Sequence, residues 1–310
     1  AASDVYKRQF IGFVRLQYPE WELADFQVEL INTLDRLEKG TLGKNNLLIT
    51  MPPRHAKSTF GTVLFPSYYM AKKPNRFTMS CSYNSQLATD FGRQIRGVVE
   101  QKNMNQAFKD FHLSRDSRAA DVWRTESGGA YFAVGIGGTT SGRPANLLIV
   151  DDPIKSREEA ESMTQRNKTW NYYTSALATR LQPESDGTPP RQIIILTRWH
   201  VDDLAGRLMQ TEDWQEGRWE HVNFPAIKEV TSGKMSRRML SEDDPNYLTS
   251  EQYSKVSPAK RNISTTQEEP LWKERFPLDE LKRRERLNPR EFASLYQQMP
   301  YVEGLSLIHI

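Results

Sequence analysis

Three apolar runs, each followed at once by polar residues, constrain the fold of this chain more than any other feature. The runs are NLLIT from Asn46, NLLIV from Asn146 and RQIIIL from Arg191. Continuous apolar runs of this length are typical of parallel strands that are buried on both faces. Because ligands bind at the carboxyl ends of the strands in an open α/β sheet, the polar residues after the three runs are predicted to meet at one edge.

The first run leads into MPPRHAKST, a proline-rich turn that brings Lys57, Ser58 and Thr59 to the start of a predicted helix. In a phosphate-binding loop, backbone N–H groups converge on the β- and γ-phosphates, a lysine neutralises them, and a hydroxyl completes the Mg²⁺ shell. The pattern G-x-x-x-x-G-K-[ST] itself fails, because Met51 and Ala56 occupy the glycine positions. A strand, a turn and a basic helix start with no ligand would explain this loop equally well when it is taken alone.

The second run ends in the paired carboxylates Asp151 and Asp152, and the third ends in Thr197 and Arg198. Adjacent strand residues point to opposite faces of a sheet, so the two carboxylates are expected to divide two tasks. Hydrolysis of a phosphoanhydride needs a metal ligand and a group that orients and deprotonates water. We expect Asp151, partly through water, and Ser58 to hold Mg²⁺, and Asp152 to act on the attacking water.

Two arginines and one aromatic–amide pair are further candidates. Arg143, eight positions before Asp151 in the loop GGTTSGRPA, and Arg54, inside the first loop, compete to stabilise charge on the γ-phosphate. Either arginine would serve equally well in a surface ion pair. Phe26 and Gln27 precede the loop on a predicted helix, where an aromatic ring can stack on adenine and an amide can both donate to and accept from its edge. A core ring beside a solvated amide is an equally good interpretation.

Composition limits the class of protein and not its activity. The 310 residues are 37% hydrophobic and carry a net charge of +3, so nucleic-acid binding is permitted but would depend on local patches. No run approaches the roughly 18 apolar residues of a membrane span. The one cysteine, Cys81, excludes an intrachain disulfide and a multi-cysteine metal site, and we expect it to be a buried small hydrophobic residue.

The sequence divides into a predicted core over residues 10–227 and a polar insertion or linker with a helical lid subdomain over residues 228–300. The basic face of the last predicted helix, from Lys282 to Arg286, favours a solvated surface over contact with DNA. Residues 1–9 and 305–310 do not continue the neighbouring patterns and resemble translated cloning sequence, so we expect them to be non-native.

The ordered combination of MPPRHAKST, SGRPANLLIVDDPIKS and IILTRWH resembles the ATPase domain of large terminase subunits, the DNA-packaging motors of tailed phages and prophages. The stretch WKERFPLDELKRRERLNPREFASLYQQMP resembles the segment C-terminal to that domain, and the resemblance extends from Phe10 to Tyr301. It implies an α/β fold of the P-loop NTPase type (ASCE group), with a mostly parallel sheet flanked by helices and a small C-terminal helical or linker subdomain.

The resemblance also implies roles for single residues. Arg143 would act across a subunit boundary, with Arg54 as its competitor, and Thr197 and Arg198 would couple hydrolysis to movement. The remaining candidates form the expected nucleotide and metal site: Phe26, Gln27, Pro53, Arg54, His55, Ala56, Lys57, Ser58, Thr59, Asp151 and Asp152.

Two positions depart from the family pattern. Ala56 stands where glycine is common, and its Cβ would crowd the approach of a phosphate. Asp152 stands where glutamate is frequent, so the attacking water would have to lie closer. Both departures bear on the rate of hydrolysis more than on the fold.

The implied function is Mg²⁺-dependent hydrolysis of ATP that drives double-stranded DNA into a procapsid, by a homo-oligomeric ring in the cytoplasm of a bacterial host. A small terminase subunit and a portal protein would be partners, and no membrane is involved. The nuclease domain of the family is absent from this chain, so nuclease activity is not predicted. The alternatives are a helicase-type ATPase, for which too little core remains after Trp219, and a nucleotide-binding scaffold with a degenerate loop.

Overall fold

The computed structural model describes residues 9–236, 247–257 and 262–302, so the expected non-native segments 1–8 and 305–310 lie outside the described residues. The chain forms two units, one of which is Pro225–Leu287 and the other the remainder. The second unit therefore ends before residue 300, the boundary expected from the sequence. The physical reason is that residues after 287 pack on the core, where the guanidinium of Arg157 pairs with Glu291 at 2.7 Å.

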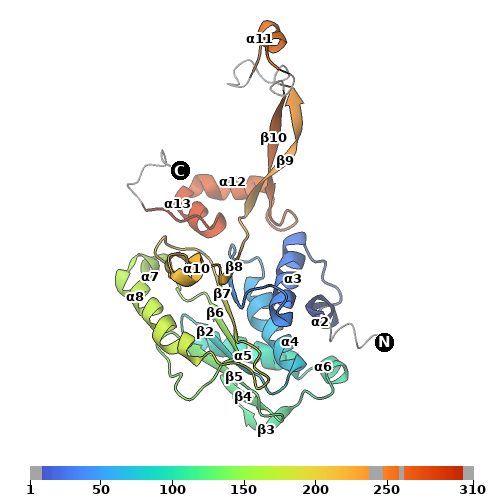
Figure 1. Cartoon of the computed structure of the whole chain (residues 1–310), viewed down its shortest axis with the longest axis vertical. Coiled ribbons are helices and arrows are strands. Elements are labelled where there is room, and N and C mark those ends of the chain that lie inside the picture. Colours follow the sequence, from blue (N-terminus) through green and yellow to red (C-terminus); the bar gives the residue numbers. More distant parts are fainter. Residues whose placement is uncertain (1–8, 237–246, 258–261, 303–310) are drawn as a thin grey trace. The chain divides into compact units, whose positions relative to one another are not determined.

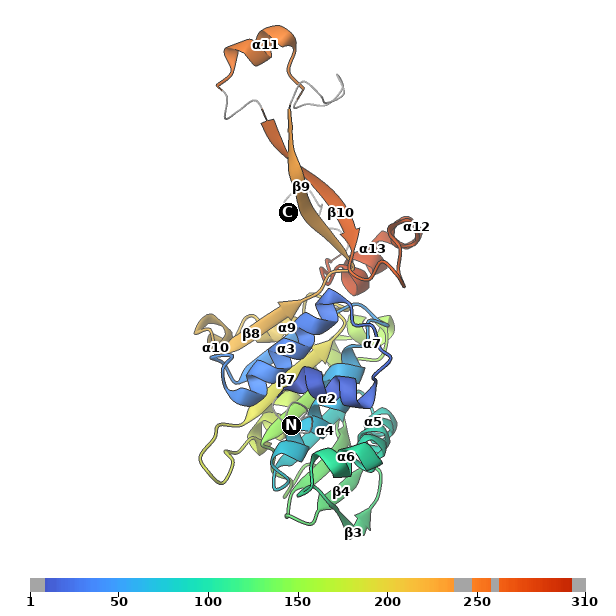
Figure 2. The same cartoon turned by 90° about the vertical axis from the view of Figure 1, so that its right-hand side faces the viewer.

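An eight-stranded sheet in the order β3-β4-β5-β2-β6-β7-β1-β8 forms the centre of the first unit (Figures 1 and 2). The strands from β5 to β8 in this order are parallel, and β3 and β4 are antiparallel at one edge. The strands are β1 Asn46–Thr50, β2 Phe77–Ser82, β3 Leu113–Arg118, β4 Val122–Thr125, β5 Ala130–Gly135, β6 Leu147–Asp151, β7 Arg191–Leu196 and β8 Trp219–Asn223.

The three apolar runs are the three adjacent central strands β6, β7 and β1, and every residue of β6 and β7 is buried. The strand register pairs Thr50 with Leu196 and Asp151 with Ile195, so the carboxyl ends of these strands lie at one level. The predicted α/β fold with a mostly parallel sheet is confirmed.

Helices cover both faces of this sheet (Figure 1). One face packs against η2 and α9, whose Leu177 and Leu204 share a buried cluster with Met79 and Cys81 of β2. The predicted burial of Cys81 is confirmed. The helices of this unit are α2 Phe10–Gln17, α3 Asp25–Lys39, η1 Thr59–Leu64, α4 Phe65–Lys72, α5 Ser85–Val99, α6 Lys102–Ala107, α7 Arg157–Glu161, α8 Met163–Tyr172, η2 Tyr173–Leu177, η3 Ala178–Arg180, α9 Leu204–Leu208, α10 Glu212–Gln215, α13 Pro289–Glu291 and η6 Phe292–Tyr296.

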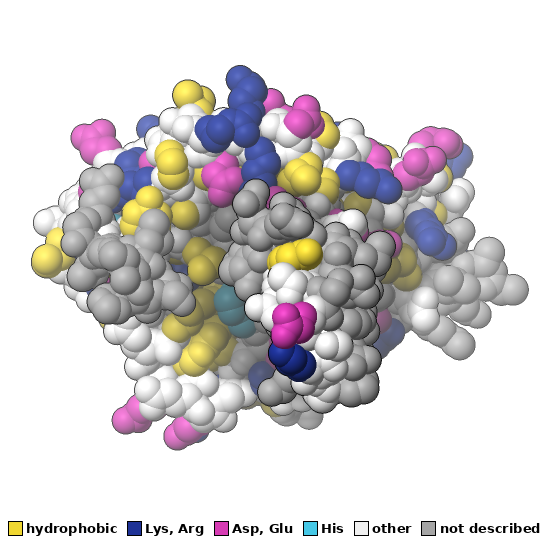
Figure 3. Space-filling model, turned by 90° about the horizontal axis from the view of Figure 1, so that it is seen from above, with side chains coloured by type: hydrophobic (Ala, Val, Ile, Leu, Met, Phe, Trp, Pro, Cys, Tyr) yellow, Lys and Arg dark blue, Asp and Glu magenta, His cyan; other side chains and the backbone are white. Residues whose placement is uncertain are grey.

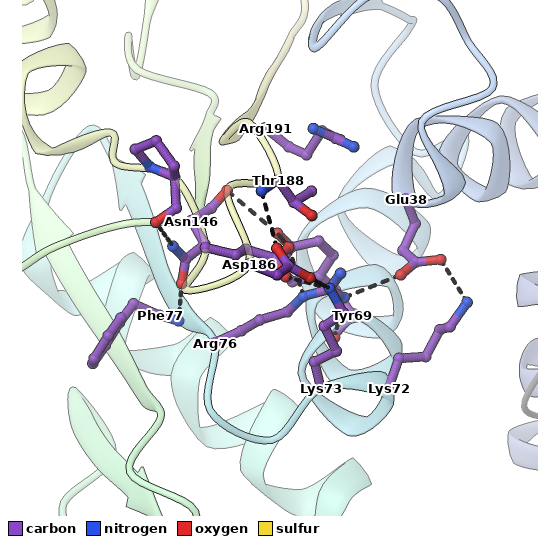
Figure 4. A network of polar contacts seen from close by, with 12 residues as sticks. Glu38, Tyr69, Lys72, Lys73, Arg76, Phe77, Asn146, Asp186, Thr188 and Arg191 are labelled. Atoms are coloured by element: carbon purple, nitrogen blue, oxygen red, sulfur yellow. Dashed lines mark hydrogen bonds and ion pairs between the residues drawn. The ribbon is translucent and has the colours of Figure 1, made fainter.

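A network of buried charges ties helices to the amino-terminal ends of the strands (Figure 4). Its centre is Arg76, 3% exposed and just before β2, whose guanidinium bonds to Glu184 at 2.9 Å and to Glu38 at 3.1 Å. Lys72 on α4 and Lys73 pair with the same two glutamates, each at 2.7 Å. These contacts join α3, α4, β2 and the loop before β7 at the edge of the sheet opposite to the polar strand ends.

The second unit is a long antiparallel hairpin of β9 Ile227–Ser236 and β10 Asn262–Pro270, with α11 Ser250–Lys255 between the strands in sequence and α12 Leu278–Leu287 after them. The predicted basic face of α12 is largely neutralised, because Arg283 and Arg284 both pair with Glu280, and Lys282 pairs with Glu268. Basic and acidic side chains are also interspersed on the face of the molecule seen in Figure 3. A solvated helix face accounts for this charge run.

In the part of the chain that the structure describes, no helix has the length and apolar character that crossing a membrane requires.

Candidate active site

The loop after β1 takes a tight path that places Lys57 at the first turn of a helix. Arg54 and Ala56 both have left-handed backbone conformations, with φ of 64° and 65°. Between them His55 is fully buried, and its Nδ1–H donates to the carbonyl of Pro53 at 2.9 Å. Burial lowers the pKa of His55 to about 4 against the opposing effect of that bond, and Lys57 adds to the lowering, so the ring is neutral at pH 7.

The helix that Lys57 begins runs very close to the central strand β7. A Cβ on Gly61 would lie 2.2 Å from the Cδ1 of Ile195, so only glycine permits this approach. The stretch Thr59–Leu64 forms the π-helical segment η1, and such segments are frequent at functional sites.

Lys57 and Asp152 form an ion pair, with Nζ 2.8 Å from Oδ2. The lysine side chain is 9% exposed and the aspartate 30%. Burial disfavours the ammonium, but the charges of Asp152 and Asp151 outweigh it and raise the pKa of Lys57. The prediction that Lys57 meets the strand carboxylates at one sheet edge is confirmed.

Asp151 is almost completely buried at the end of β6, and one of its oxygens, Oδ2, accepts a hydrogen bond from Thr62 at 2.7 Å. The other oxygen, Oδ1, has no hydrogen-bond partner among the described residues. Burial and the nearby charge of Asp152 raise the pKa of Asp151 to about 6, although Lys57, Thr62 and Ser58 favour its ionised form. A buried carboxylate oxygen without a partner can accept a cation, and cation affinity there should rise as the pH passes upward through 6.

The donors at this edge fit Mg²⁺ better than a metal held by protein groups alone. No group of three or more His, Cys, Asp or Glu that could hold a metal ion occurs among the described residues. Mg²⁺ keeps several waters and is commonly held by one or two carboxylates together with substrate phosphates. Asp151 and the half-buried hydroxyl of Ser58 supply hard oxygen ligands of that kind.

The expectation that Asp151 and Asp152 point to opposite faces is wrong. β6 ends at Asp151, and Asp152 has a left-handed conformation with φ of 43°, which breaks the alternation of a strand. Both carboxylates therefore contact the same helical stretch, Asp151 through Thr62 and Asp152 through Lys57.

Thr197 links the ends of all three central strands. Its N–H donates to Oδ1 of Asp152 at 3.2 Å, and its hydroxyl donates to the carbonyl of Met51 at 3.1 Å. Arg198, which is also buried, pairs with Asp203 at 2.9 Å. The two predicted coupling residues thus differ in position, since Thr197 touches the site and Arg198 stabilises the turn behind it.

The predicted nucleobase residues are buried in this structure. Phe26 is 2% exposed and packs edge-on against His55 and Phe224. Gln27 is 4% exposed, and its Oε1 accepts from the backbone N–H of Ala24 at the start of α3. These contacts correspond to the core interpretation of Phe26, and binding of adenine by either residue stays a prediction.

Sequence reasoning missed an exposed aromatic pair near the loop. The rings of Tyr18 and Trp21 stack at 3.8 Å, and Trp21, 42% exposed, contacts Phe60 of η1 edge-on. It also missed Thr62, which contacts Asp151 from 89 positions away. An isolated threonine inside an apolar helix carries no signal of this kind in a single sequence.

The two candidate arginines lie in different places. Arg54 is exposed within the loop and makes no ion pair in the described ranges. Arg143 is half-buried, and its guanidinium lies over the ring of Phe132 on β5, 5.6 Å from the ring centroid. β5 is four strand spacings from β1, or about 19 Å. Within one chain Arg143 is therefore remote from Lys57.

No protein-family model and no curated protein matches this chain. Among solved structures it is similar to the large terminase of bacteriophage HK97, with 13% identity and a TM-score of 0.49, over 71% of this chain and 44% of that one. It is similar to a mutant of the large terminase ATPase domain of Thermus phage P74-26, with 11% identity and a TM-score of 0.48, over 92% of this chain and 96% of that one. A third is the large terminase of a thermophilic bacteriophage in complex with ATP-γ-S, with 10% identity and a TM-score of 0.40, over 66% and 45%.

This chain thus spans less than half of the first of these proteins. The three structures come from the family that the sequence motifs resemble, and at such identities the likeness concerns the fold alone.

Proposed function

We propose that this chain is a Mg²⁺-dependent ATPase that acts as the motor of a DNA-packaging terminase. The observation that carries the proposal is the convergence of Lys57, Asp151 and Asp152 at the carboxyl ends of adjacent strands. The three groups supply a phosphate-binding cation, a metal ligand and an acceptor for the proton of water, which phosphoanhydride hydrolysis requires.

The proposed reaction uses the ion pair of Lys57 and Asp152 as a starting state. Nucleotide phosphates compete with Asp152 for Lys57, and once the lysine turns to them, Oδ2 of Asp152 becomes free to accept a proton from water. The N–H of Thr197 continues to hold Oδ1, so the carboxylate stays oriented while its other oxygen reacts. Ser58 and Asp151 would hold Mg²⁺, and the chemistry that bound Mg²⁺ supplies is neutralisation of charge on the phosphate oxygens.

Movement of double-stranded DNA, assembly into a ring, the small-subunit and portal partners, and work in a bacterial cytoplasm are parts of the proposal that the motif resemblance supports. Thr197 is the residue through which the state of Asp152 would reach the rest of the chain, because it also contacts Met51 at the end of β1.

Steady-state ATP turnover of single variants tests the catalytic proposal. Lys57→Ala and Asp152→Asn are each expected to lower kcat about 100-fold or more, because each removes a charge that acts in the transition state. Asp152→Asn should also bind nucleotide several-fold more tightly, since it releases Lys57 and removes a negative charge beside the phosphates.

The matched control is Asp186→Asn, which changes an exposed ion-paired carboxylate on a remote loop and should leave turnover unaltered. Equal turnover in the unaltered chain and in both site variants would show that hydrolysis does not occur here. Binding of ATP in calorimetry without turnover would instead favour a nucleotide-binding scaffold, for which the strained Ala56 in the loop is the motivating observation.

A further inference from the structure

Gln298 lies far from the candidate site in sequence and touches it in space. It is 5% exposed and has a left-handed backbone, with φ of 59°. Its side-chain oxygen Oε1 accepts a hydrogen bond from the backbone N–H of Arg198 at 3.0 Å, and its Nε2 donates to the carbonyl of Leu295 at 2.5 Å. Both polar ends of the amide are therefore engaged in fixed directions.

The peptide that Gln298 holds is next to the one that holds Asp152. Thr197 donates its N–H to Oδ1 of Asp152, and Arg198 follows it directly at the end of β7. A shift of the Arg198 amide would rotate the Thr197 peptide and misplace the carboxylate. The hydrogen bond from Arg198 to Gln298 thus acts on Asp152 through a single intervening residue.

A second contact fixes the same loop to the same C-terminal segment. Arg157 pairs with Glu291 through two hydrogen bonds of 2.7 and 3.0 Å and also donates to the carbonyl of Trp199. Arg290 pairs with Glu161 on the same helix as Arg157, at 2.5 Å. The segment from Asn288 to Gln298 consequently holds the loop after β7 at two points.

The backbone of Gln298 adds an independent argument. A residue other than glycine in a left-handed conformation is strained, and such strain persists where the surroundings impose it, most often at functional sites. Nothing about packing at the surface explains this conformation, whereas it is the conformation in which the amide of Gln298 meets Arg198.

We propose that Gln298 is a positioning residue for ATP hydrolysis, which it supports by fixing the Arg198 and Thr197 peptides that orient Asp152. This inference rests on the proposed ATPase function. Gln298 contacts neither Lys57 nor Asp152 in the described structure, so its removal should impair the chemical step and leave the binding of nucleotide intact.

The test is steady-state ATP hydrolysis by the full chain with Gln298→Ala and Gln298→Glu. The alanine variant should lower kcat about 10- to 100-fold with KM for ATP within about twofold, which is the pattern of lost transition-state positioning. The glutamate variant keeps an oxygen that accepts from Arg198 and should retain kcat within a few-fold. Met299→Ala, which changes the exposed neighbouring residue, is the matched control and should behave like the unaltered chain.

Several results would overturn the inference. Unaltered kcat in Gln298→Ala, a change confined to KM, or equal loss in the alanine and glutamate variants with lowered melting temperatures would each do so. If Gln298→Ala does not fold, Gln298→Gly carries the same test, because glycine accepts the left-handed backbone but has no amide. If the unaltered chain itself fails to hydrolyse ATP, the proposed function is wrong and this inference falls with it. An active chain with a fully active Gln298→Ala variant refutes the inference alone.

Discussion

Backbone strain in this protein is concentrated at one place. Among the described residues, those other than glycine with positive φ are Arg54, Ala56, Asp152 and Gln298. The first two lie in the loop before Lys57, the third is its ion-pair partner, and the fourth binds the turn beside Thr197. Each such conformation costs roughly 1–2 kcal/mol, and its retention at four positions of one sheet edge is typical of a functional site.

The strain at Ala56 leads to a prediction at the scale of one residue. Ala56→Gly should raise the free energy of unfolding by about 0.5–1 kcal/mol, because glycine adopts a φ of 65° without a steric penalty, partly offset by the greater freedom of the unfolded chain. It should leave ATP turnover equal or increase it, since the Cβ beside Lys57 is removed. Thermal unfolding and steady-state turnover measure the two effects.

The control for this prediction is the same substitution in a helix. Ala176→Gly, at a half-buried position of η2, should lower the free energy of unfolding by about 0.5–1 kcal/mol, the opposite sign. If Ala56→Gly is also destabilising, the left-handed conformation of residue 56 is not a source of strain.

At the scale of the elements, the sheet is fastened at one edge and reactive at the other. The network around Arg76 joins α3, α4, β2 and the loop before β7 at the amino-terminal edge, as Figure 4 shows. The guanidinium also lies 3.8 Å from the ring centroid of Tyr69 and donates to the carbonyl of that residue at 2.8 Å. Fixing this edge allows strained loops at the other edge to persist.

Removal of Arg76 should therefore be costly. Arg76→Met is expected to lower the free energy of unfolding by about 3–5 kcal/mol, because Glu38 and Glu184 would stay buried with only Lys72 and Lys73 to pair with them. Arg93→Met is the matched control: its guanidinium is 63% exposed and pairs with Asp90 at the surface, so the loss should be below about 1 kcal/mol. Urea unfolding of both variants measures the difference, and equal losses would mean that the network has no special role.

The sequence predicted the elements better than the details of the site. Strands β1, β6 and β7 were accessible because continuous apolar runs mark buried parallel strands, and their polar ends meet because the topology requires it. The helical region expected over residues 11–38 is instead two helices, α2 and α3, interrupted near Pro19. The left-handed turn at Asp152 was not accessible, since aspartate is compatible with many conformations. The contact of Arg198 with Gln298 spans 100 positions, and no local pattern encodes it.

At the scale of the whole molecule, the position of Arg143 requires a second copy of the chain if this arginine acts in catalysis. Its guanidinium lies over β5, about 19 Å from the strand that leads to Lys57, so it cannot complete the site of its own chain in this conformation. Arg54 is the competing candidate within the chain, exposed and without an ion pair among the described residues. The two arginines make different predictions about assembly.

Mixing of variants separates these two arginines. Arg143→Ala and Lys57→Ala should each be inactive as assembled rings, with Arg143→Ala losing about 10³-fold or more if it is an arginine finger. Rings that contain both variants should regain activity, because an interface between Lys57 of one chain and Arg143 of its neighbour is intact, and random mixing at equal amounts produces about a quarter of such interfaces. Turnover measured against the mixing ratio should therefore pass through a maximum. A straight line between two inactive preparations, or full activity of Arg143→Ala alone, would exclude Arg143 as a group acting in trans, and a loss of turnover in Arg54→Ala would then assign the function to the arginine within the loop.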